Sequence, residues 1–208
     1  MKKGIFITFE GPDGSGKSTQ ARLFAAALVK KGFSCILTRE PGGTPFAESI
    51  RNLLLKPGKN VFPLTELLLY AASRAQHTQE LIKPALARGT VVICDRYSDS
   101  TIAYQYFGRK LDKQLIYRLN EIAAGGLKPD LTIVLDIKTR QGMKRVSKNG
   151  PKDRLENENI QFHERIRNGF LKLATEDPKR IKLISGNDSV EAIHAKIMEI
   201  AWAFLKGK

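Results

Sequence analysis

Short apolar runs alternate along the chain with stretches in which apolar residues recur every three or four positions. The first run, GIFITFE at 4–10, is rich in β-branched and aromatic residues and leads into a glycine-rich segment. Similar runs follow at 34–40, 90–95, 131–136 and 180–186. Apolar runs of this kind are typical of strands that are covered on both faces, as in a parallel sheet. We therefore predict one strand for each run.

Helical periodicity fills much of the intervals between these runs. It predicts helices over 17–31, 45–55 and 64–89, and an amphipathic helix over 189–207. Strand and helix thus alternate along the sequence. This order predicts an α/β fold, doubly wound around a five-stranded parallel sheet, in a single domain that spans residues 1–208.

Composition changes this picture little. Apolar residues make up 42% of the chain and charged residues 27%, and no apolar run approaches the roughly 18 residues that span a bilayer. The apolar patch Ile5–Phe9 is too short for a signal peptide, so we expect a cytoplasmic protein without a membrane partner. Cys35 and Cys94 lie in two of the apolar runs, and we expect buried thiols there instead of a disulfide.

The net charge of +14 raises the possibility of nucleic-acid binding. Half of this charge lies in residues 137–182, where 13 basic residues face 6 acidic ones. These basic residues are not interleaved with aromatic ones in the manner of a single-strand stacking platform. We therefore expect an anionic small substrate and no nucleic-acid partner. His77, His163 and His194 lack metal-ligand spacing and are expected on helix surfaces.

The segment FEGPDGSGKSTQ at 9–20 matches the phosphate-binding pattern G-x-x-x-x-G-K-[ST] between a predicted strand and a predicted helix. Backbone N–H groups of such a loop and the positive end of the following helix bind phosphate oxygens. Lys17 is expected to reach the β- and γ-phosphates, and the Ser18 hydroxyl to bind Mg²⁺. The predicted ATP-binding residues are Gly11, Pro12, Asp13, Gly14, Ser15, Gly16, Lys17, Ser18 and Thr19.

A phosphate loop alone does not identify the molecule that accepts the phosphoryl group. The chain has no N-K-x-D element, and its one D-x-x-G element, Asp13–Gly16, lies inside the loop, which argues against a GTPase switch. A small-molecule kinase needs arginines and aromatic residues near the carboxyl ends of the strands. Three stretches meet this need: TREPGGT at 38–44, LYAASR at 69–74 and DRYSDSTIAYQ at 95–105.

Together with the phosphate loop and RVSKNGPKDRLE at 145–156, these stretches resemble the thymidylate kinase family in order and spacing. The resemblance covers nearly the whole chain. It implies transfer of the ATP γ-phosphoryl group to dTMP with Mg²⁺, a step in dTTP biosynthesis, by a homodimer. A kinase for another monophosphate and an ATP-dependent nucleic-acid-binding protein are the alternatives.

The resemblance also assigns roles to single residues. Arg96 would hold the 5′-phosphate of dTMP, Tyr70 would stack on thymine, and Arg74 would bind a base carbonyl. Tyr104 would lie under the sugar, where a 2′-hydroxyl would crowd it, and Asp95 would join Ser18 at the metal. The full dTMP-binding set is Asp13, Arg51, Tyr70, Arg74, Arg96, Ser100, Thr101, Tyr104 and Gln105.

Structural roles compete with each of these assignments. The two tyrosines would serve equally well as core aromatics, Arg51 and Arg74 as surface ion-pair partners, and Ser100 and Thr101 as helix caps. Tyr70 stands where Phe is commoner in the family, so its hydroxyl needs a partner.

Basic residues cluster in a predicted mobile lid at about 145–157, where Asn149-Gly150-Pro151 breaks the helical pattern. The variable positions of the phosphate loop contain no arginine, and family members of that kind carry the catalytic charge in the lid. Arg145 and Arg154 are the candidates, with Arg154 preferred because Asp153 and Glu156 could fix its rotamer. The predicted catalytic residues are Asp13, Lys17, Arg96, Arg145 and Arg154.

Overall fold

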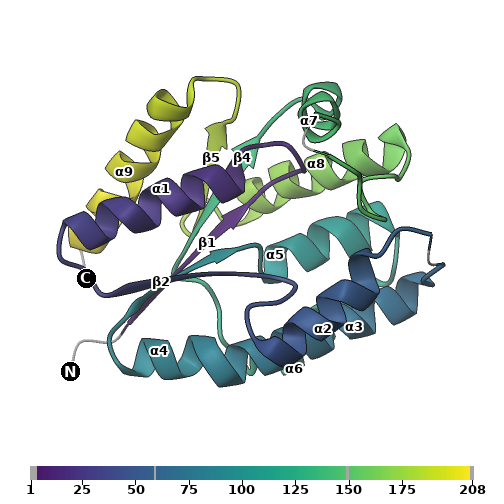
Figure 1. Ribbon diagram of the computed structural model, residues 1–208, viewed down its shortest axis with the longest axis horizontal. Coiled ribbons are helices and arrows are strands. Elements are labelled where there is room, and N and C mark those ends of the chain that lie inside the picture. The colour runs from purple at the N-terminus through teal and green to yellow at the C-terminus, as the bar shows by residue number, and fades with distance from the viewer. Residues whose placement is uncertain (1–3, 59, 149, 207–208) are drawn as a thin grey trace.

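The five predicted strands form one parallel sheet in the computed structural model, which describes residues 4–58, 60–148 and 150–206 (Figure 1). The strand order is β2-β3-β1-β4-β5, so β1 lies in the centre and the chain winds outward in both directions. In this register Thr8 pairs with Cys94 on one side and with Thr132 on the other. The strands are β1 Ile5–Glu10, β2 Cys35–Arg39, β3 Val91–Asp95, β4 Leu131–Asp136 and β5 Ile181–Ser185.

Helices cover both faces of the sheet, as the doubly wound fold requires (Figure 1). Helices α1 and α9 lie on one face, whereas α4, α6 and α8 lie on the other, with α2 and α3 beyond them. The α-helices are α1 Lys17–Lys30, α2 Pro45–Leu55, α3 Pro63–His77, α4 Lys83–Ala87, α5 Ser98–Thr101, α6 Lys113–Ala124, α7 Thr139–Val146, α8 Ile160–Glu176 and α9 Val190–Lys206.

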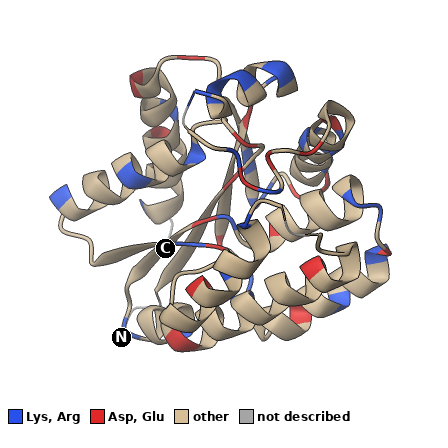
Figure 2. Ribbon diagram, turned by 45° about the vertical axis from the view of Figure 1, so that its right-hand side comes forward, with Lys and Arg blue, Asp and Glu red and all other residues tan. Residues whose placement is uncertain are grey.

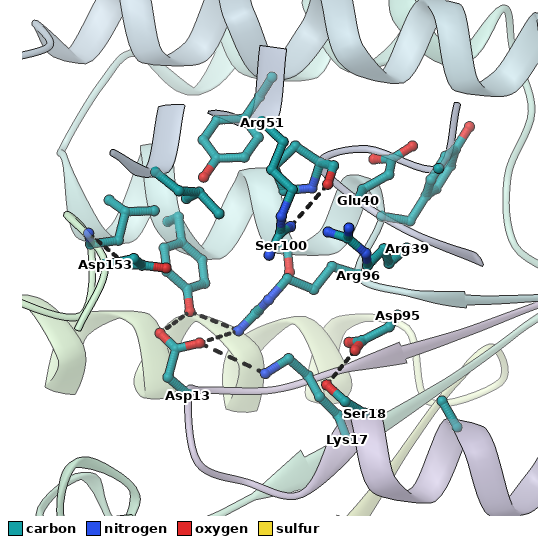
Figure 3. Close-up of a pocket in the computed structure, with 18 of the residues that line it drawn as sticks. Asp13, Lys17, Ser18, Arg39, Glu40, Arg51, Asp95, Arg96, Ser100 and Asp153 are labelled. Atoms are coloured by element: carbon teal, nitrogen blue, oxygen red, sulfur yellow. Dashed lines mark hydrogen bonds and ion pairs between the residues drawn. The ribbon is translucent and has the colours of Figure 1, made fainter. Parts of the chain in front are cut away.

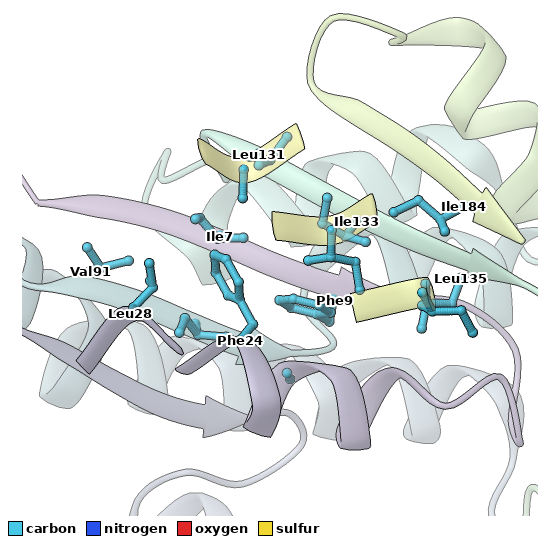
Figure 4. Close-up of a cluster of buried hydrophobic side chains, with 14 residues drawn as sticks. Ile7, Phe9, Phe24, Leu28, Val91, Leu131, Ile133, Leu135 and Ile184 are labelled. Atoms are coloured by element: carbon cyan, nitrogen blue, oxygen red, sulfur yellow. The ribbon is translucent and has the colours of Figure 1, made fainter. Parts of the chain in front are cut away.

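The core under α1 and α9 contains apolar side chains from four neighbouring strands (Figure 4). Ile7 and Phe9 of β1 point to this face, and Phe9 packs against Phe24 of α1 with 5.7 Å between ring centroids. The same strand sends Phe6 to the opposite face, against Tyr97. Because both faces are apolar, the strand reads as a continuous hydrophobic run in the sequence.

Polar side chains are also buried in the sheet, where they form hydrogen bonds with one another. The hydroxyls of Thr8 and Thr132 are 2.7 Å apart on adjacent strands and are fully buried. Arg180 binds the carboxylate of Asp99 with contacts of 2.7 and 3.0 Å and also reaches Thr132. Paired in this way, the buried polar groups avoid the cost of an unsatisfied donor or acceptor.

The predicted helix over 64–89 is continuous in space but changes its winding. Helix α3 passes into a π-helical segment, η1 Thr78–Ile82, and then into α4. A second π-helical segment, η2 Ile102–Gly108, follows α5 directly. The wider π turn accommodates extra residues within a helix and is frequent at functional sites. Residues of both segments line the candidate site: Leu81 of η1, and Tyr104 and Gln105 of η2.

The predicted lid begins in the last turn of α7, which contains Arg145, and its other described residues before α8 form turns and irregular structure without a regular helix or strand. Asn149, part of the predicted break in the helical pattern, lies outside the described residues. Of the two cysteines, Cys94 is buried as predicted, whereas Cys35 is only partly buried because β2 is an edge strand. Within the described part of the chain, no helix has the length and apolar character of a membrane span.

Candidate active site

The phosphate loop connects the carboxyl end of β1 to the first turn of α1. Its glycines adopt the left-handed backbone that favours glycine, with φ angles of 135° at Gly11, 73° at Gly14 and 92° at Gly16. A Cβ atom at Gly14 would lie 2.3 Å from the Gly142 carbonyl oxygen of α7. This close approach of two backbones places the start of the lid directly against the phosphate loop.

Lys17 and Asp13 lie in the interior of the loop. The Lys17 side chain folds over it, with its Nζ atom 3.5 Å from the Pro12 carbonyl oxygen and 3.7 Å from the Asp13 carboxylate. Burial and the positive charge of Arg96 lower the pKa of Lys17. Burial opposes the ionisation of Asp13, but Arg96, Lys17 and the Tyr104 hydroxyl together lower its pKa to about 2. Asp13 is therefore a carboxylate throughout the neutral range.

Arg96 holds the centre of the site from the loop after β3 (Figure 3). Its φ angle of 72° places a non-glycine residue in the left-handed region, a conformation with an energetic cost that is concentrated at functional sites. One terminal nitrogen donates to the Gly11 carbonyl at 3.1 Å and to the Ser100 hydroxyl at 3.0 Å. The other terminal nitrogen donates to the Asp13 carboxylate at 2.5 Å.

Tyr104 joins this cluster through its hydroxyl, which sequence reasoning did not anticipate. The hydroxyl donates to the second carboxylate oxygen of Asp13 at 2.7 Å and accepts from Arg96 at 3.0 Å. Its ring lies edge to face against Phe162 of α8 and is 6% exposed. Tyr104 therefore contributes more than the shape of its ring, because its hydroxyl helps to hold Asp13 and Arg96 in place.

The Ser18 hydroxyl and the Asp95 carboxylate lie in contact where α1 begins and β3 ends (Figure 3). The second Asp95 oxygen is buried and has no hydrogen-bond partner among the described residues. A hydroxyl and a carboxylate with a free buried oxygen, next to a phosphate loop, are the oxygen ligands that Mg²⁺ prefers. The residues present therefore fit a magnesium ion.

A cleft of about 920 Å³ opens at the carboxyl edge of the sheet in front of these groups. Its size suits a small ligand, and open α/β sheets bind their ligands at this edge. Four phosphate-loop residues line it: Asp13, Gly14, Lys17 and Ser18. So do all the residues predicted to bind the acceptor: Asp13, Arg51, Tyr70, Arg74, Arg96, Ser100, Thr101, Tyr104 and Gln105.

Comparison with known proteins decides what family has this site. A sequence model described as thymidylate kinase matches residues 9–197. The chain belongs to the thymidylate kinase family. A thymidylate kinase of Geobacter sulfurreducens is 50% identical over 204 residues, which cover 95% of this chain and 96% of that protein. One from Nostoc sp. is 49% identical, with 98% of both chains covered.

A solved structure extends the similarity to the fold. The crystal structure of a thymidylate kinase from Ehrlichia chaffeensis superposes on this chain with a TM-score of 0.79 at 36% sequence identity. The superposition covers 96% of this chain and 99% of that one. The predicted fold class is confirmed: a parallel five-stranded sheet with flanking helices, as in the phosphate-loop kinases.

For the residues predicted to bind the base in this member of the thymidylate kinase family, the contacts show which structural alternatives hold. Arg74 is 2% exposed, so it is not a surface ion-pair former. Ser100 does not cap a helix; its hydroxyl donates to Glu10 at 2.5 Å. The Thr101 hydroxyl is buried and lacks a partner among the described residues, which leaves it free for a ligand in the cleft. Gln105 bonds to Glu66 at 3.0 Å through its side-chain nitrogen.

The two lid arginines lie in different places. Arg145 donates to the carbonyl oxygens of Gly14, at 3.3 Å, and of Gly186, at 3.1 Å, so it lies beside the phosphate loop. Its helix α7 is strongly basic; Lys and Arg residues are coloured blue in Figure 2. Arg154 instead bonds to the Leu54 carbonyl at 2.8 Å and forms an ion pair of 2.6 Å with Glu66.

This arrangement corrects the reasoning that favoured Arg154. Its neighbours Asp153 and Glu156 do not fix its rotamer; the Glu156 carboxylate accepts from the backbone N–H of Asp153 at 2.9 Å, and Asp153 in turn binds two backbone N–H groups. These contacts close a turn of the lid on itself. Sequence proximity suggested an ion pair, but the local backbone donors compete for the same carboxylates.

Three buried carboxylates belong to the site although sequence reasoning gave them no role. They are Glu10, Glu40 and Glu66, each at most 4% exposed. A charged residue in an otherwise apolar run, as at Glu10, was the available signal, because carboxylates are seldom buried without a partner. The expectation for the histidines was wrong for two of them: His77 is 0% and His163 5% exposed.

Proposed function

We propose that this chain transfers the γ-phosphoryl group of ATP to the 5′-phosphate of dTMP, giving ADP and dTDP. The observation that carries the proposal is the single cleft in which a phosphate loop and Arg96 meet a wall of base-side residues. A phosphate loop supplies one nucleotide site, and Arg96, held at the loop carbonyl of Gly11, supplies an anchor for a second phosphate next to it. Since ATP and dTMP are nucleotides of the cytoplasm, we place the enzyme there.

The chain's own residues provide positioning and charge, which is most of what phosphoryl transfer asks of a protein. Lys17 would contact the β- and γ-phosphates, with loop N–H groups and the start of α1 around them. Arg96 would align the acceptor phosphate and offset its repulsion from the γ-phosphate. Asp13 forms ion pairs with both of these cations and so holds them close together before substrate binds.

A magnesium ion would be held by Ser18 and Asp95 and would neutralise charge on the β- and γ-phosphates. The free, buried oxygen of Asp95 is the support for this assignment. On the acceptor side, Tyr70 would stack on the thymine ring and Arg74 would donate to a base carbonyl. Tyr104 would lie near the sugar, with its hydroxyl engaged by Asp13 and Arg96.

Lid closure would bring further positive charge to the transferred group and exclude water. We assign the larger part to Arg145, because α7 approaches the phosphate loop at Gly14 and the Arg145 guanidinium already reaches that carbonyl. We assign the smaller part to Arg154, because its guanidinium is engaged in an ion pair with the buried Glu66. This order reverses the preference drawn from the sequence.

A homodimer is part of the proposal, formed through the exposed face of α2 and α3. These two helices pack side by side at the edge of the molecule farthest from α1 (Figure 1). Their outer surface carries large apolar side chains that are 49–70% exposed: Phe46, Leu53, Phe62, Leu64 and Leu68. Contiguous apolar surface of this kind on two adjacent helices fits a second copy of the chain. Sedimentation velocity is expected to give a dimer, and a monomer for Leu53→Asp.

One assay separates the proposed reaction from its alternatives. ADP release is measured with ATP and Mg²⁺ over a panel of nucleoside monophosphates, with and without single-stranded DNA or RNA. We expect dTMP to give the highest kcat/KM, no stimulation by nucleic acid, and loss of activity on chelation of Mg²⁺. A preference for another monophosphate would assign a different acceptor, and stimulation by nucleic acid without any monophosphate response would overturn the kinase proposal.

Arg74→Ala tests the assignment of the base side within the same assay. Losing a hydrogen bond from a charged group costs about 1.5–3 kcal/mol, so the KM for dTMP is expected to rise at least tenfold. The KM for ATP should remain close to that of the unchanged chain, because Arg74 lies across the cleft from the phosphate loop. An unchanged KM for dTMP would leave Arg74 with a structural role only.

A further inference from the structure

A chain of buried and half-buried polar side chains runs behind the base side of the cleft, and its central histidine has no role in the reaction proposed above. It contains Thr38 at the end of β2, Glu40 in the following loop, and Arg74 and His77 on α3. Their side chains come from segments 34 to 39 residues apart and meet under the cleft. Arg74, Glu40 and His77 are 2%, 4% and 0% exposed.

Each carboxylate oxygen of Glu40 has its own donor. Arg74 Nε donates to Oε2 at 2.8 Å, and His77 Nδ1 donates to Oε1 at 3.0 Å. A carboxylate held at both oxygens cannot turn about its terminal bond. Because Arg74 already balances the charge of Glu40, the histidine is not needed as a counter-ion, and its contribution is orientation.

The hydrogen bonds of His77 engage both ring nitrogens. The Glu40 carboxylate only accepts, so Nδ1 carries a hydrogen, and Nε2 is hydrogen-bonded to the Thr38 hydroxyl, 2.7 Å away. The ring is also enclosed by the loop after β2: a Cβ atom at Gly43 would lie 2.5 Å from Nε2. The imidazole therefore has one position and one set of partners.

The contacts of Arg74 fix the plane of its guanidinium group. Besides Nε on Glu40, its Nη1 atom donates to Asn120 Oδ1 at 2.6 Å, and its guanidinium carbon lies 5.0 Å from the centre of the Tyr97 ring. No hydrogen bond to its Nη2 atom occurs among the described residues. Because Arg74 lines the cleft, Nη2 can donate to a ligand there.

We propose that Glu40 and His77 are positioning residues that set the direction of the Arg74 guanidinium, and hence the discrimination between bases of the acceptor nucleotide. The inference rests on the proposed function, in which Arg74 reads the base. In this arrangement Thr38 orients His77, His77 orients Glu40, and Glu40 orients Arg74. A guanidinium that loses its support still has its charge but no longer presents Nη2 in one direction, so it binds a base carbonyl with less preference.

The test compares His77→Leu, which removes both ring nitrogens, with His77→Asn, whose side-chain N–H can replace the Nδ1 donor. For His77→Leu we expect the KM for dTMP to rise about tenfold, with kcat and the KM for ATP within about threefold of the unchanged chain. The preference for dTMP over dCMP should fall by a similar factor. His77→Asn should recover most of both losses, because it restores the bond to Glu40.

Thr8→Val is the matched control. It removes another fully buried hydrogen bond, to Thr132, in the centre of the sheet and without contact to Arg74. If His77→Leu merely loosens the fold, both variants will lower the melting temperature and leave the ratio of dTMP to dCMP unchanged, and the proposal is wrong. Should His77→Leu fail to fold, Thr38→Val carries the test, since it removes the outer hydrogen bond of the chain; an unchanged ratio there also refutes the proposal.

Arg74→Ala distinguishes this inference from the proposed function. If Arg74→Ala raises the KM for dTMP and His77→Leu does not, only the positioning role fails. If Arg74→Ala leaves the KM for dTMP unchanged, Arg74 does not read the base, and the assignment of the base side fails first.

Discussion

Glu10 provides a prediction that links a single buried carboxylate to the stability of the whole chain. It ends β1 immediately before the phosphate loop and is 0% exposed. Its Oε1 atom accepts from the backbone N–H of Tyr97 at 2.7 Å and of Ser100 at 3.3 Å. Despite these donors, burial and the nearby Asp99 carboxylate raise the pKa of Glu10 to about 8.

The sign of the effect follows from proton binding. In the unfolded chain Glu10 has the ordinary pKa near 4.5, so between pH 4.5 and 8 the folded state binds one proton more than the unfolded state. The stabilisation from Glu10 is complete below pH 4.5 and is lost as the pH rises to 8. The slope is at most about 1.4 kcal/mol per pH unit. Sharing of the proton with Asp99 will spread the loss over a wider range.

The perturbation is Glu10→Gln, which keeps the shape of the side chain and removes its titration. Unfolding by urea is measured for both chains at pH 5.5, 6.5 and 7.5. The free energy of unfolding of the unchanged chain, relative to the variant, should fall by roughly 1 kcal/mol for each pH unit. Glu121→Gln is the control, since Glu121 is exposed on α6 and forms an ion pair with the exposed Arg118.

Parallel curves for the unchanged chain and Glu10→Gln would refute the reasoning. That result would mean that the three donors around the carboxylate outweigh burial and keep Glu10 ionised throughout this range. A loss of stability at all three pH values by the same amount would identify the hydrogen bonds, and not the proton, as the contribution of Glu10.

Two further predictions concern the reaction. Arg145→Ala should lower kcat by about 100-fold or more, since arginines that meet the transferred group contribute about 10³–10⁵. Arg154→Ala should chiefly lower the melting temperature, because it removes one of the two arginines that pair with the buried Glu66. The reverse order of effects would restore Arg154 as the catalytic arginine. Tyr104→Phe should lower kcat/KM for dTMP by about tenfold, because it removes the hydroxyl that donates to Asp13. Wild-type kinetics would show that the ring acts by its shape alone.

The sequence predicted the sheet well because each strand is recognisable locally. Both faces of an apolar strand such as 131–136 are buried only when helices cover the two sides of the sheet, so the run alone indicates a central strand. The strand order lies beyond this reasoning, because hydrogen bonding between β1 and β4 joins segments that are far apart in the chain. The π-helical turn at Thr78–Ile82 escaped for a related reason, since it depends on packing against other elements and not on the helical period.

The candidate site was predictable to the extent that its residues follow the ends of strands. Asp95 ends β3 and Arg96 follows it, and the phosphate loop follows β1, so parallel pairing of the two strands brings these residues together. The partners of the longer side chains were not predictable. Arg74 and Arg154 each have a buried carboxylate partner supplied by a different segment, which no local pattern indicates.

The site must also hold its positive charges together before any phosphate is present. Lys17 and Arg96 approach each other across the phosphate loop, and the repulsion contributes to the lowered pKa of Lys17. Asp13 lies between them, 3.7 Å from one and 2.5 Å from the other, and its carboxylate also receives the Tyr104 hydroxyl. Because these donors lower the pKa of Asp13 to about 2, the carboxylate does not become protonated as the pH falls through the neutral range.

An incoming phosphate therefore meets cations that are already in position. The left-handed backbone of Arg96 and its contact with the Gly11 carbonyl fix where the guanidinium lies relative to the phosphate loop. In the proposed reaction Asp13 would compete with the acceptor phosphate for Arg96, so the acceptor would gain less binding energy than a free guanidinium would give. The lost binding energy is offset by geometry, because the cationic side chains need little reorganisation when the two nucleotides bind. A preorganised charge stabilises the transition state more than the ground state.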